Sequence, residues 1–485
     1  MRDALRRAEY TFDAVTTVLG SEANAALLRN ETTPGLRATI GGSPLETLTR
    51  LWLLQTTVPV EAAQAALPGL VDALCAVGVL ERSVGEVAAR LDLRPYAADD
   101  AHLWIASDLT PGLDGAPTRV SPDHVLGLSP AARSLVELTV RDRVGSALDL
   151  GTGCGLQALH LAGHSGRVVA TDVNPRALWL TRLNASLNEV AIEVRDGSLF
   201  EPVTGEEVDL IVSNPPFVIG PGTGERLVYR DSGLPGDAVV EQIVRAAPGH
   251  LKQGGTCQVL ANWLVPTGGG WQDRMAGWVP DDCDMWVVQR ESVDLPSYVE
   301  LWLKDAGLHP STGGSRTDYL RRYDAWLAWL EHTGAEAVGF GWINLRRRAG
   351  PETSQRPSRR LEEWPWEVAQ PLGDEVAAHF ARTATLGAVD DEALLAAKLR
   401  VRADVRQETL GAPGAADPGQ ILLRQQTGLR RARQVDTAEA ALVGACDGDL
   451  PLGSLLDAIA GLTAGTVSVA TVRELVAEGY LTFPG

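Results

Sequence analysis

The residues best suited to chemistry are Asn214, Pro215, Pro216 and Phe217, which follow an apolar run typical of a buried strand. The side-chain carbonyl of Asn214 and the main-chain carbonyl of Pro215 can each accept one N–H of an incoming NH2 group. Such a pair would orient a planar nitrogen and let positive charge develop on it. Two prolines stiffen the turn, and Phe217 offers a flat face for stacking. The motif predicts a catalytic site for a planar nitrogen, with a purely structural turn as the alternative.

Glycines recur in a second motif, which runs from Asp149 to Gly155 and joins an apolar run to a helix-forming segment. Glycines let the backbone approach a ligand closely, and the N-terminus of a helix favours a carboxylate. The acid at Asp149 would repel a phosphate but attract an ammonium group. A nucleotide-binding loop is the alternative interpretation of this motif. We expect a cofactor site that includes Asp149, Gly151, Thr152, Gly153 and Gly155.

Polar residues also follow the next two apolar runs. An acid at Asp172 can accept hydrogen bonds from both hydroxyls of a ribose. In the loop after the next run, an acid or a main-chain amide would hold the edge of an adenine ring, and either Asp196 or Ser198 could do so. Parallel strands end at one edge of a sheet, so these loops should meet there. The expected cofactor-binding set is thereby extended by Asp172, Asn174, Asp196, Gly197, Ser198 and Asn214.

Strand-like and helix-like segments alternate around these motifs. Helices are expected at 156–161 and 175–187, and a helical, Trp-rich insert is expected ahead of the last strand, with its tryptophans in the core. The alternation predicts an α/β fold whose mainly parallel, seven-stranded sheet is covered by helices on both faces. The seven strands are expected at 147–150, 167–171, 192–194, 208–212, 256–264, 285–289 and 337–345.

Three domains are predicted, with residues 109–350 as the central one. Residues 1–108 contain three helical runs and a strand at 79–82 that could pair with 103–106, which favours a winged-helix-like unit. This unit would bind a substrate or nucleic acid, or would serve as a scaffold; its segment 68–77 has no basic residue. Residues 351–485 should be mainly helical, with a second winged-helix-like end, after a polar linker at about 350–364.

The composition limits the remaining possibilities. A net charge of −19 weighs against nonspecific nucleic-acid binding, although charge can be local. Arginines cluster at 346–348 and 356–360, either as a basic patch or as a solvated strand end and linker. Five scattered cysteines indicate neither a metal site nor disulfides. Without a signal sequence or a membrane-length apolar run, the chain is expected in the cytoplasm and not in a membrane.

Residues 120–265 resemble the HemK/PrmC-type N-methyltransferases, which modify a glutamine of peptide-chain release factors. They are also similar to the ribosomal RNA guanine-N2 and tRNA adenine-N6 methyltransferases that share the NPP(Y/F) loop. The resemblance implies a Rossmann-like, class I methyltransferase sheet and the cofactor S-adenosyl-L-methionine. It implies that the acid and glycines of the Asp149 motif line the cofactor, that Asp172 holds its ribose, and that Asn214 clamps the substrate.

The resemblance leaves the substrate open. Phe217 stands where the release-factor enzymes more usually have Tyr, and Phe is commoner in the RNA group. The partner is therefore a macromolecule, either a translation protein that offers a glutamine amide or an RNA that offers an exocyclic amino group. A third interpretation is a cofactor-binding regulator whose winged helices bind nucleic acid. In this superfamily a segment such as 121–130 folds over the methionine end of the cofactor.

Overall fold

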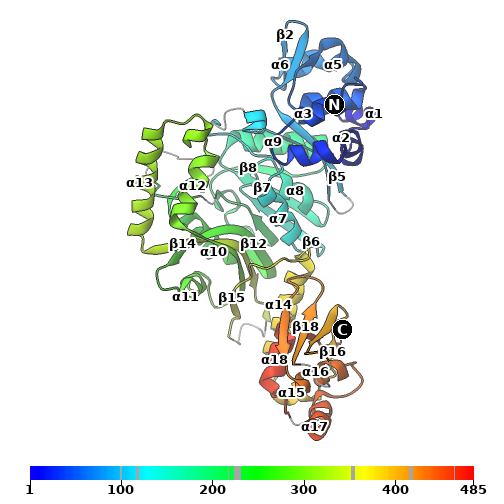
Figure 1. Ribbon diagram of the computed structural model, residues 1–485, viewed down its shortest axis with the longest axis vertical. Coiled ribbons are helices and arrows are strands. Elements are labelled where there is room, and N and C mark those ends of the chain that lie inside the picture. Colours follow the sequence, from blue (N-terminus) through cyan, green and yellow to red (C-terminus); the bar gives the residue numbers. More distant parts are fainter. Residues whose placement is uncertain are drawn as a thin grey trace.

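The computed structural model describes residues 1–98, 101–115, 120–216, 218–222, 231–350, 356–413, 419–463 and 465–484. Figure 1 shows a large central part with a smaller part at each end, the N-terminal one at the top and the C-terminal one at the bottom. No helix in these ranges is both long enough and apolar enough to cross a membrane.

The central part is built on an eight-stranded sheet with the order β15-β13-β14-β12-β9-β6-β7-β8. Strands β8, β7, β6, β9 and β12 are parallel, while β14 runs antiparallel to both of its neighbours. The strands are β6 (Val144–Leu150), β7 (Ser165–Asp172), β8 (Glu193–Asp196), β9 (Val208–Ser213), β12 (Leu251–Pro266), β13 (Cys283–Asp294), β14 (Ala335–Arg347) and β15 (Arg359–Glu363).

Strand β15 corrects two expectations, because the sheet has eight strands rather than seven and residues 359–363 are not a linker. Its five residues, RRLEE, lack the apolar alternation that marks a strand. It pairs only with β13, at the edge of the sheet, where charged residues are tolerated. Nor are the arginines nearby all solvated, since Arg348 is buried, 3.7 Å from Asp284.

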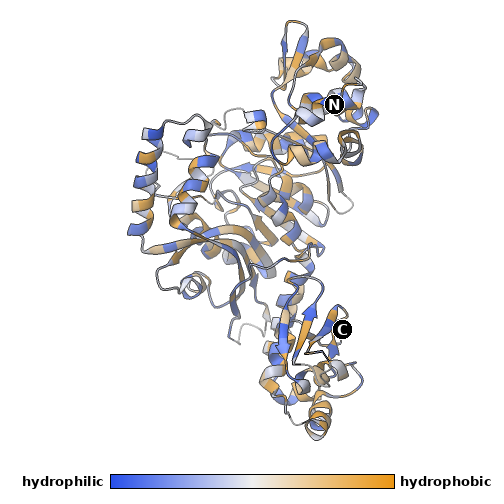
Figure 2. Ribbon diagram, in the orientation of Figure 1, coloured by the Kyte–Doolittle hydropathy of each residue, from blue (hydrophilic) through white to orange (hydrophobic). Residues whose placement is uncertain are grey.

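Helices cover both faces of the sheet. On one face α7 (Pro130–Leu138), α8 (Leu156–Leu161) and α14 (Gly373–Ala388) pack in one core with residues of β6, β7 and β9. On the other face lie α10 (Ala238–Ala246) and α11 (Trp271–Ala276). Figure 2 shows that the strands between these layers are mostly apolar, as a sheet covered on both faces requires.

The helical insert between β13 and β14 consists of α12 (Leu295–Asp305) and α13 (Arg316–His332), at the left of Figure 1. As the sequence predicts, Trp302 and Trp326 are buried in a core of their own, and Trp329 packs against it half-buried.

The N-terminal part combines short helices with two small sheets. Strand β2 pairs with β3, and β5 pairs with β4, so the expected pairing of 79–82 with 103–106 is wrong. The strands that pair instead, β3 with β2 and β4 with β5, lie nearer to each other in the chain. The elements are α1 (Arg2–Arg7), α2 (Phe12–Leu27), α3 (Thr33–Ala38), α4 (Pro44–Leu48), β1 (Val58–Pro59), α5 (Val60–Ala66), α6 (Val71–Ala76), β2 (Leu80–Ser83), β3 (Glu86–Ala89), β4 (Asp92–Ala98) and β5 (Ala101–Ser107).

The C-terminal part is mixed rather than mainly helical. The sequence does not predict its three-stranded antiparallel sheet, β17-β18-β19, because charged residues interrupt the apolar alternation of the strands. A separate core joins this sheet to the helices. The elements after α14 are α15 (Asp391–Ala396), β16 (Arg400–Val401), β17 (Val405–Leu410), β18 (Gln420–Gln425), β19 (Ala432–Val435), α16 (Thr437–Ala445), α17 (Leu452–Leu462), α18 (Val469–Ala477) and β20 (Leu481–Thr482). The winged-helix interpretation of both ends stays a prediction.

Candidate active site at the carboxyl edge of the sheet

Four parallel strands bring the loops expected from the sequence to one edge. Leu150 at the end of β6 is the register partner of Ser213 on one side and of Thr171 on the other. One strand further out, Asp172 pairs with Asp196. Because neighbouring strands lie about 4.8 Å apart, the glycine loop, the two acids and Asn214 face one shared region.

The glycine loop curls over the end of β6. The main-chain N–H groups of Gly151 and Thr152 both donate to the carbonyl of Thr171, each at 2.9 Å. Gly151 and Gly153 have positive φ angles of 75° and 56°, which side chains with a Cβ rarely adopt. A Cβ added at Gly155 would lie 3.0 Å from Thr181 Cγ2, so that position has no room for a side chain.

Asp149 lies beneath this loop and is 1% exposed. Its Oδ2 accepts hydrogen bonds from Thr152 Oγ1 at 2.6 Å and from the Ala158 N–H, in the first turn of α8, at 3.0 Å. Burial raises the pKa of this carboxyl to about 7 despite both hydrogen bonds. In this structure Asp149 therefore ties the loop to the helix.

Asp172 lies at the end of β7 and is half-buried. One of its oxygens accepts the Gly153 N–H at 3.0 Å and the other accepts the Asn174 N–H at 2.9 Å. Burial, with the nearby charge of Asp196 as a smaller contribution, raises the pKa of Asp172. No ion pair joins Asp149 or Asp172 to a basic side chain within the described ranges. Among the described residues, these two acids are therefore not balanced by a basic side chain.

Asn174 has a capping role in this structure. Its side-chain oxygen accepts the Arg176 N–H at 2.9 Å and so caps α9 (Pro175–Leu187). Its Nδ2 donates to the main-chain oxygen of Asp123 at 2.8 Å. This contact holds the segment 120–128 over the glycine loop, where Val125 Cγ1 lies 4.0 Å from the Cβ position of Gly153.

The two candidates for holding an adenine edge both lie in the loop after β8. Asp196 and Ser198 are exposed, and the Ser198 N–H faces Glu201 Oε2 at 3.4 Å. Gly197 between them donates its N–H to the Asp172 carbonyl at 3.1 Å. A Cβ at Gly197 would lie 2.6 Å from Pro202 Cγ, so the loop needs a glycine there. The choice between Asp196 and Ser198 stays open.

Asn214 directly follows β9 beside the glycine loop. Ser213, fully buried, donates its hydroxyl to the carbonyl of Leu150 at 2.8 Å and so fixes the strand end. The Oδ1 atom of Asn214 is buried and has no hydrogen-bond partner in the part of the chain that the structure describes. Pro215 is buried and Pro216 exposed, whereas Phe217 lies outside the described residues. A buried carbonyl oxygen is thus available at the centre of the edge.

The helical insert contacts the chain that follows Asn214 and holds it in place. The sequence does not predict this contact. Ile219, in β10 (Val218–Gly220), donates its N–H to Tyr298 Oη at 2.7 Å. Its carbonyl accepts the Nε1–H of Trp326 at 3.0 Å. Both aromatic residues are fully buried. Because they lie about 80 and 107 positions from Ile219, no local spacing in the sequence reveals them.

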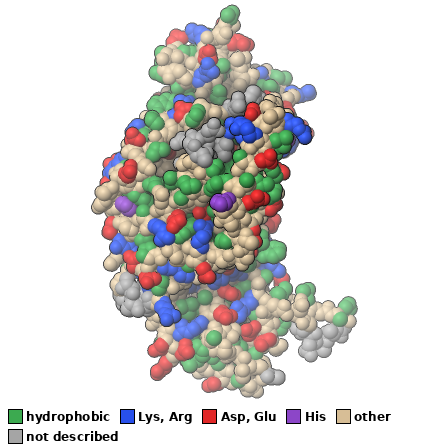
Figure 3. Space-filling model, turned by 90° about the vertical axis from the view of Figure 1, so that its left-hand side faces the viewer, with side chains coloured by type: hydrophobic (Ala, Val, Ile, Leu, Met, Phe, Trp, Pro, Cys, Tyr) green, Lys and Arg blue, Asp and Glu red, His purple; other side chains and the backbone are tan. Residues whose placement is uncertain are grey.

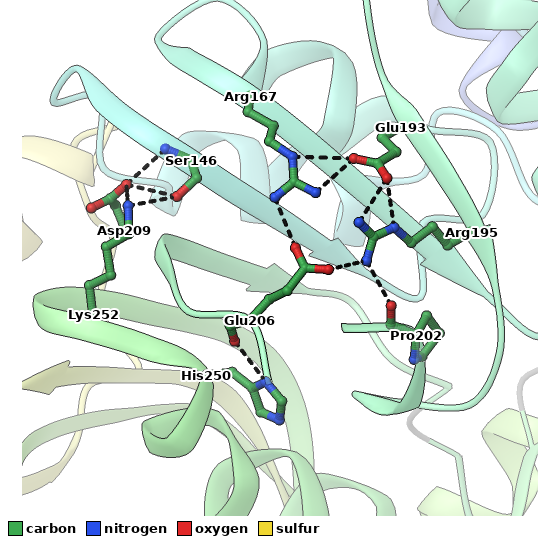
Figure 4. Close-up of polar contacts among 9 residues, drawn as sticks. All are labelled: Ser146, Arg167, Glu193, Arg195, Pro202, Glu206, Asp209, His250 and Lys252. Atoms are coloured by element: carbon green, nitrogen blue, oxygen red, sulfur yellow. Dashed lines mark hydrogen bonds and ion pairs between the residues drawn. The ribbon is translucent and has the colours of Figure 1, made fainter. Parts of the chain in front are cut away.

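The opposite, amino edge of the sheet provides a contrast. Figure 4 shows that Arg167 pairs with Glu193 at 2.7 Å and with Glu206 at 2.9 Å. Lys252 pairs with Asp209 at 2.8 Å in the same view. Charges at this edge neutralise one another, as in a surface network that joins strand ends. The unbalanced acids lie at the carboxyl edge, where α/β sheets bind their ligands.

Three family models match different parts of the chain. The methyltransferase small domain matches residues 127–268, which include the whole carboxyl edge described above. Two domains of unknown function match residues 7–90 (DUF7059) and 377–482 (DUF7782).

Curated relatives match the same central region. A Methanocaldococcus jannaschii protein assigned as a protein N5-glutamine methyltransferase is 32% identical over 27% of this chain and 68% of its own length. The release factor glutamine methyltransferase of Aquifex aeolicus is 36% identical over 25% of this chain and 47% of its own length. The ribosomal RNA small subunit methyltransferase C of Klebsiella pneumoniae is 31% identical over 29% and 38%. The chain thus spans less than half of the last two relatives.

Proposed function

Because the chain belongs to the class I S-adenosylmethionine-dependent methyltransferases, we propose that it methylates a planar NH2 nitrogen, with a glutamine side-chain amide of a translation protein as its substrate. The observation that carries this proposal is the buried Oδ1 of Asn214, for which the described residues supply no hydrogen-bond partner. A buried acceptor without a partner costs about 1–3 kcal/mol. The N–H of an incoming amide would remove that cost at the position where the nitrogen must be oriented.

The carboxyl edge fits the cofactor that this family uses. Its glycine loop leaves open space at Gly151, and no described basic side chain forms an ion pair with Asp149 or Asp172. The glycine loop would hold the amino-acid end of the cofactor and Asp172 would accept hydrogen bonds from the ribose, while Asp196 or Ser198 would contact the adenine. When bound, S-adenosylmethionine supplies a methyl group on a positively charged sulfur.

Asn214 and Pro215 would act on the acceptor nitrogen alone. The Asn214 Oδ1 atom and the Pro215 carbonyl accept its two N–H groups, which fixes the plane of the NH2 group and favours positive charge on it. The proton can leave to water after the transfer, so no general base is assigned. Phe217 would stack on the planar group.

The balance of charge supports a protein rather than an RNA substrate. The net charge is −19, and the arginines near the end of β14 are engaged in pairs such as Arg347 with Glu207 at 2.7 Å. In Figure 3, Lys and Arg side chains on the face with the insert lie interspersed with Asp and Glu. An exocyclic amino group of RNA is the second candidate, supported by the similarity to the ribosomal RNA enzyme.

A winged-helix-like N-terminal part fits this function as a scaffold. The succession β1, α5, α6, β2 and β3, with the strand order β1-β3-β2, supports that interpretation. Helix α6, VDALCA, carries one acid and no basic residue, which argues against nucleic-acid reading by this helix.

A labelling assay tests the substrate class. The protein is incubated with tritiated S-adenosylmethionine, purified release factors and undermodified ribosomes, and label is counted separately in protein and RNA. We expect label in a release factor, at a glutamine. Label in RNA alone would replace the leading proposal by the second, and intact cofactor binding without any label would favour the regulator.

A further inference from the structure

A cavity of about 360 Å³ lies next to the Asn214 loop and has no role in the proposed function so far. Its walls come from the start of α7, residues 260–262 of β12, residues 290–291 of β13, residues 340–342 of β14, and the chain ahead of α14. Leu260, which lines it, directly follows Val259, the register partner of Ser213 in the next parallel strand. The cavity therefore opens within one strand spacing of Asn214.

Arg290 enters this cavity from a β-bulge. The register between β13 and β14 shifts between Gln289 and Glu291, so Arg290 is the extra residue. Bulges of this kind re-aim a side chain and are frequent beside active sites. The guanidinium lies over the Trp342 ring, 5.0 Å from its centroid, and donates one hydrogen bond to the Trp364 carbonyl.

Arg290 has more N–H donors than its described protein partners use. Only burial acts on its pKa, which is lowered, and no carboxylate forms an ion pair with it in the described part of the chain. A guanidinium carries five N–H donors in a fixed fork. One is used on Trp364, and stacking on Trp342 holds the plane of the rest. The remaining donors have no acceptor among the described residues and are available to a ligand.

Asn262 gives an independent sign of a ligand. It lines the same cavity, is 3% exposed, and its buried Nδ2 has no hydrogen-bond partner among the described residues. Leu260, Phe340 and Trp342 add an apolar wall. The cavity therefore combines one buried unsatisfied donor and a guanidinium with an apolar surface, as ligand pockets combine polar and apolar groups.

We propose that this cavity binds the polypeptide segment next to the acceptor glutamine, with Arg290 and Asn262 donating hydrogen bonds to its main-chain carbonyl oxygens and the apolar wall packing against a neighbouring side chain. The inference rests on the proposed function. Arg290 and Glu291 are the charged residues of the lining, so their charges cancel. A neutral peptide suits such a lining, whereas RNA brings a negative phosphate with each nucleotide.

The test uses a probe that needs no turnover. Saturation-transfer NMR on the full-length protein with S-adenosylhomocysteine measures binding of acetyl-leucyl-glutamine N-methylamide, and of guanosine monophosphate as the nucleotide probe. The variants are Arg290→Ala, Arg290→Lys and Asn262→Ala. The matched control is Arg143→Ala, an exposed arginine just before β6 at the amino edge. Thermal melting verifies that each variant folds; Asn262→Ala removes an unsatisfied group and should not weaken folding.

We expect the dipeptide signal to fall at least fivefold in Arg290→Ala and Asn262→Ala, to fall less in Arg290→Lys, and to stay unchanged in Arg143→Ala. A dipeptide signal that is absent, or equal in all variants, would overturn the inference. So would a guanosine monophosphate signal that falls in the same variants, since it would make the cavity a nucleotide site. Tritium in a release factor together with dipeptide binding that is equal in all variants would refute the cavity and leave the proposed substrate standing. Tritium only in RNA would refute the proposed substrate, and with it the inference that rests on this substrate.

Discussion

At the scale of single residues, two side chains at the carboxyl edge carry the two proposed roles, catalysis and cofactor binding. Under the proposed function, the Oδ1 of Asn214, which has no hydrogen-bond partner among the described residues, would accept an N–H of the acceptor nitrogen. Both oxygens of Asp172 shape the loop, and this carboxylate would also hold the ribose. Their loss should therefore change different measurements.

Asn214→Ala should lower kcat by about 100-fold or more, the usual effect of removing one oriented hydrogen-bond group, and leave the Kd for S-adenosylmethionine nearly unchanged. Asp172→Ala should weaken cofactor binding first, because it frees the Gly153 N–H and removes a ribose acceptor. Calorimetric titration gives the Kd, and tritium transfer gives kcat. A collapse of cofactor affinity in Asn214→Ala would show that the clamp assignment is wrong.

Asp149 should make stability depend on pH. Its folded pKa of about 7 lies above the usual value of 3.8, so the folded state holds the proton more tightly than the unfolded state. Stabilisation is then complete below about pH 4 and is lost as the pH rises through about 7, by at most about 4 kcal/mol at roughly 1.4 kcal/mol per pKa unit.

Asp149→Asn should remove this slope and raise the free energy of unfolding of the cofactor-free protein at pH 8. Urea unfolding at pH 5 and pH 8 measures it. Asp196→Asn is the matched control, since this acid is exposed at the same edge. Parallel pH slopes in the wild type and Asp149→Asn would contradict the prediction.

At the scale of elements, the insert α12–α13 positions the chain that follows Asn214. Strand β10 pairs only with the short β11 (Asp231–Pro235) and is not part of the main sheet. Its position is therefore fixed by the hydrogen bonds to Tyr298 and Trp326 and not by pairing with the main sheet.

Tyr298→Phe tests this positioning role, because the substitution removes the acceptor of the Ile219 N–H and keeps the ring in the core. We expect kcat to fall about three- to tenfold, consistent with about 1 kcal/mol for one hydrogen bond, with the cofactor Kd unchanged. Tyr323→Phe, on the half-buried face of α13, is the control. Equal effects of the two substitutions on kcat would contradict a positioning role.

Elements were predictable where local pattern and burial agree. The five parallel strands and the two motif helices follow from apolar runs bounded by Gly, Asp and Pro, and the structure places them near the expected ranges. The pattern missed β15 and the β17–β19 sheet, because charged residues interrupt the apolar alternation of several of their strands. The Tyr298 and Arg290 contacts depend on chain pairing over long separations, which one sequence does not encode locally.

At the scale of the whole molecule, a half-buried charge cluster joins the C-terminal part to the sheet. Glu362 of β15 accepts hydrogen bonds from Arg431 Nη1 at 2.8 Å, from Arg360 Nε at 3.0 Å and from Trp286 Nε1 at 2.7 Å. These partners outweigh burial and lower the pKa of Glu362 to about 2. Arg431 directly precedes β19, so this carboxylate bridges the two parts.

Glu362→Gln should lower the free energy of unfolding by about 3 kcal/mol at pH 7, because it leaves Arg431 buried without its charge partner. In the wild type the depressed pKa gives a contribution that is present above about pH 4.5 and is lost as the pH falls toward about 2. Urea unfolding at pH 7 measures the change. Glu363→Gln, next in the chain and exposed, is the control, and equal destabilisation by both would refute the bridge.

Helix α9 also connects two parts of the molecule. At its start, the cap Asn174 holds the segment 120–128 over the glycine loop. Near its other end, Asn184 and Asn188 exchange hydrogen bonds of 2.8–2.9 Å with the backbone of β5 at Ala106 and Trp104. A movement of the N-terminal part would either break these four hydrogen bonds or move α9 and the glycine loop with it. The N-terminal flank is thus tied to the same helix whose cap lies beside the glycine loop, so a substitution at Asn184 or Asn188 would act on both parts at once.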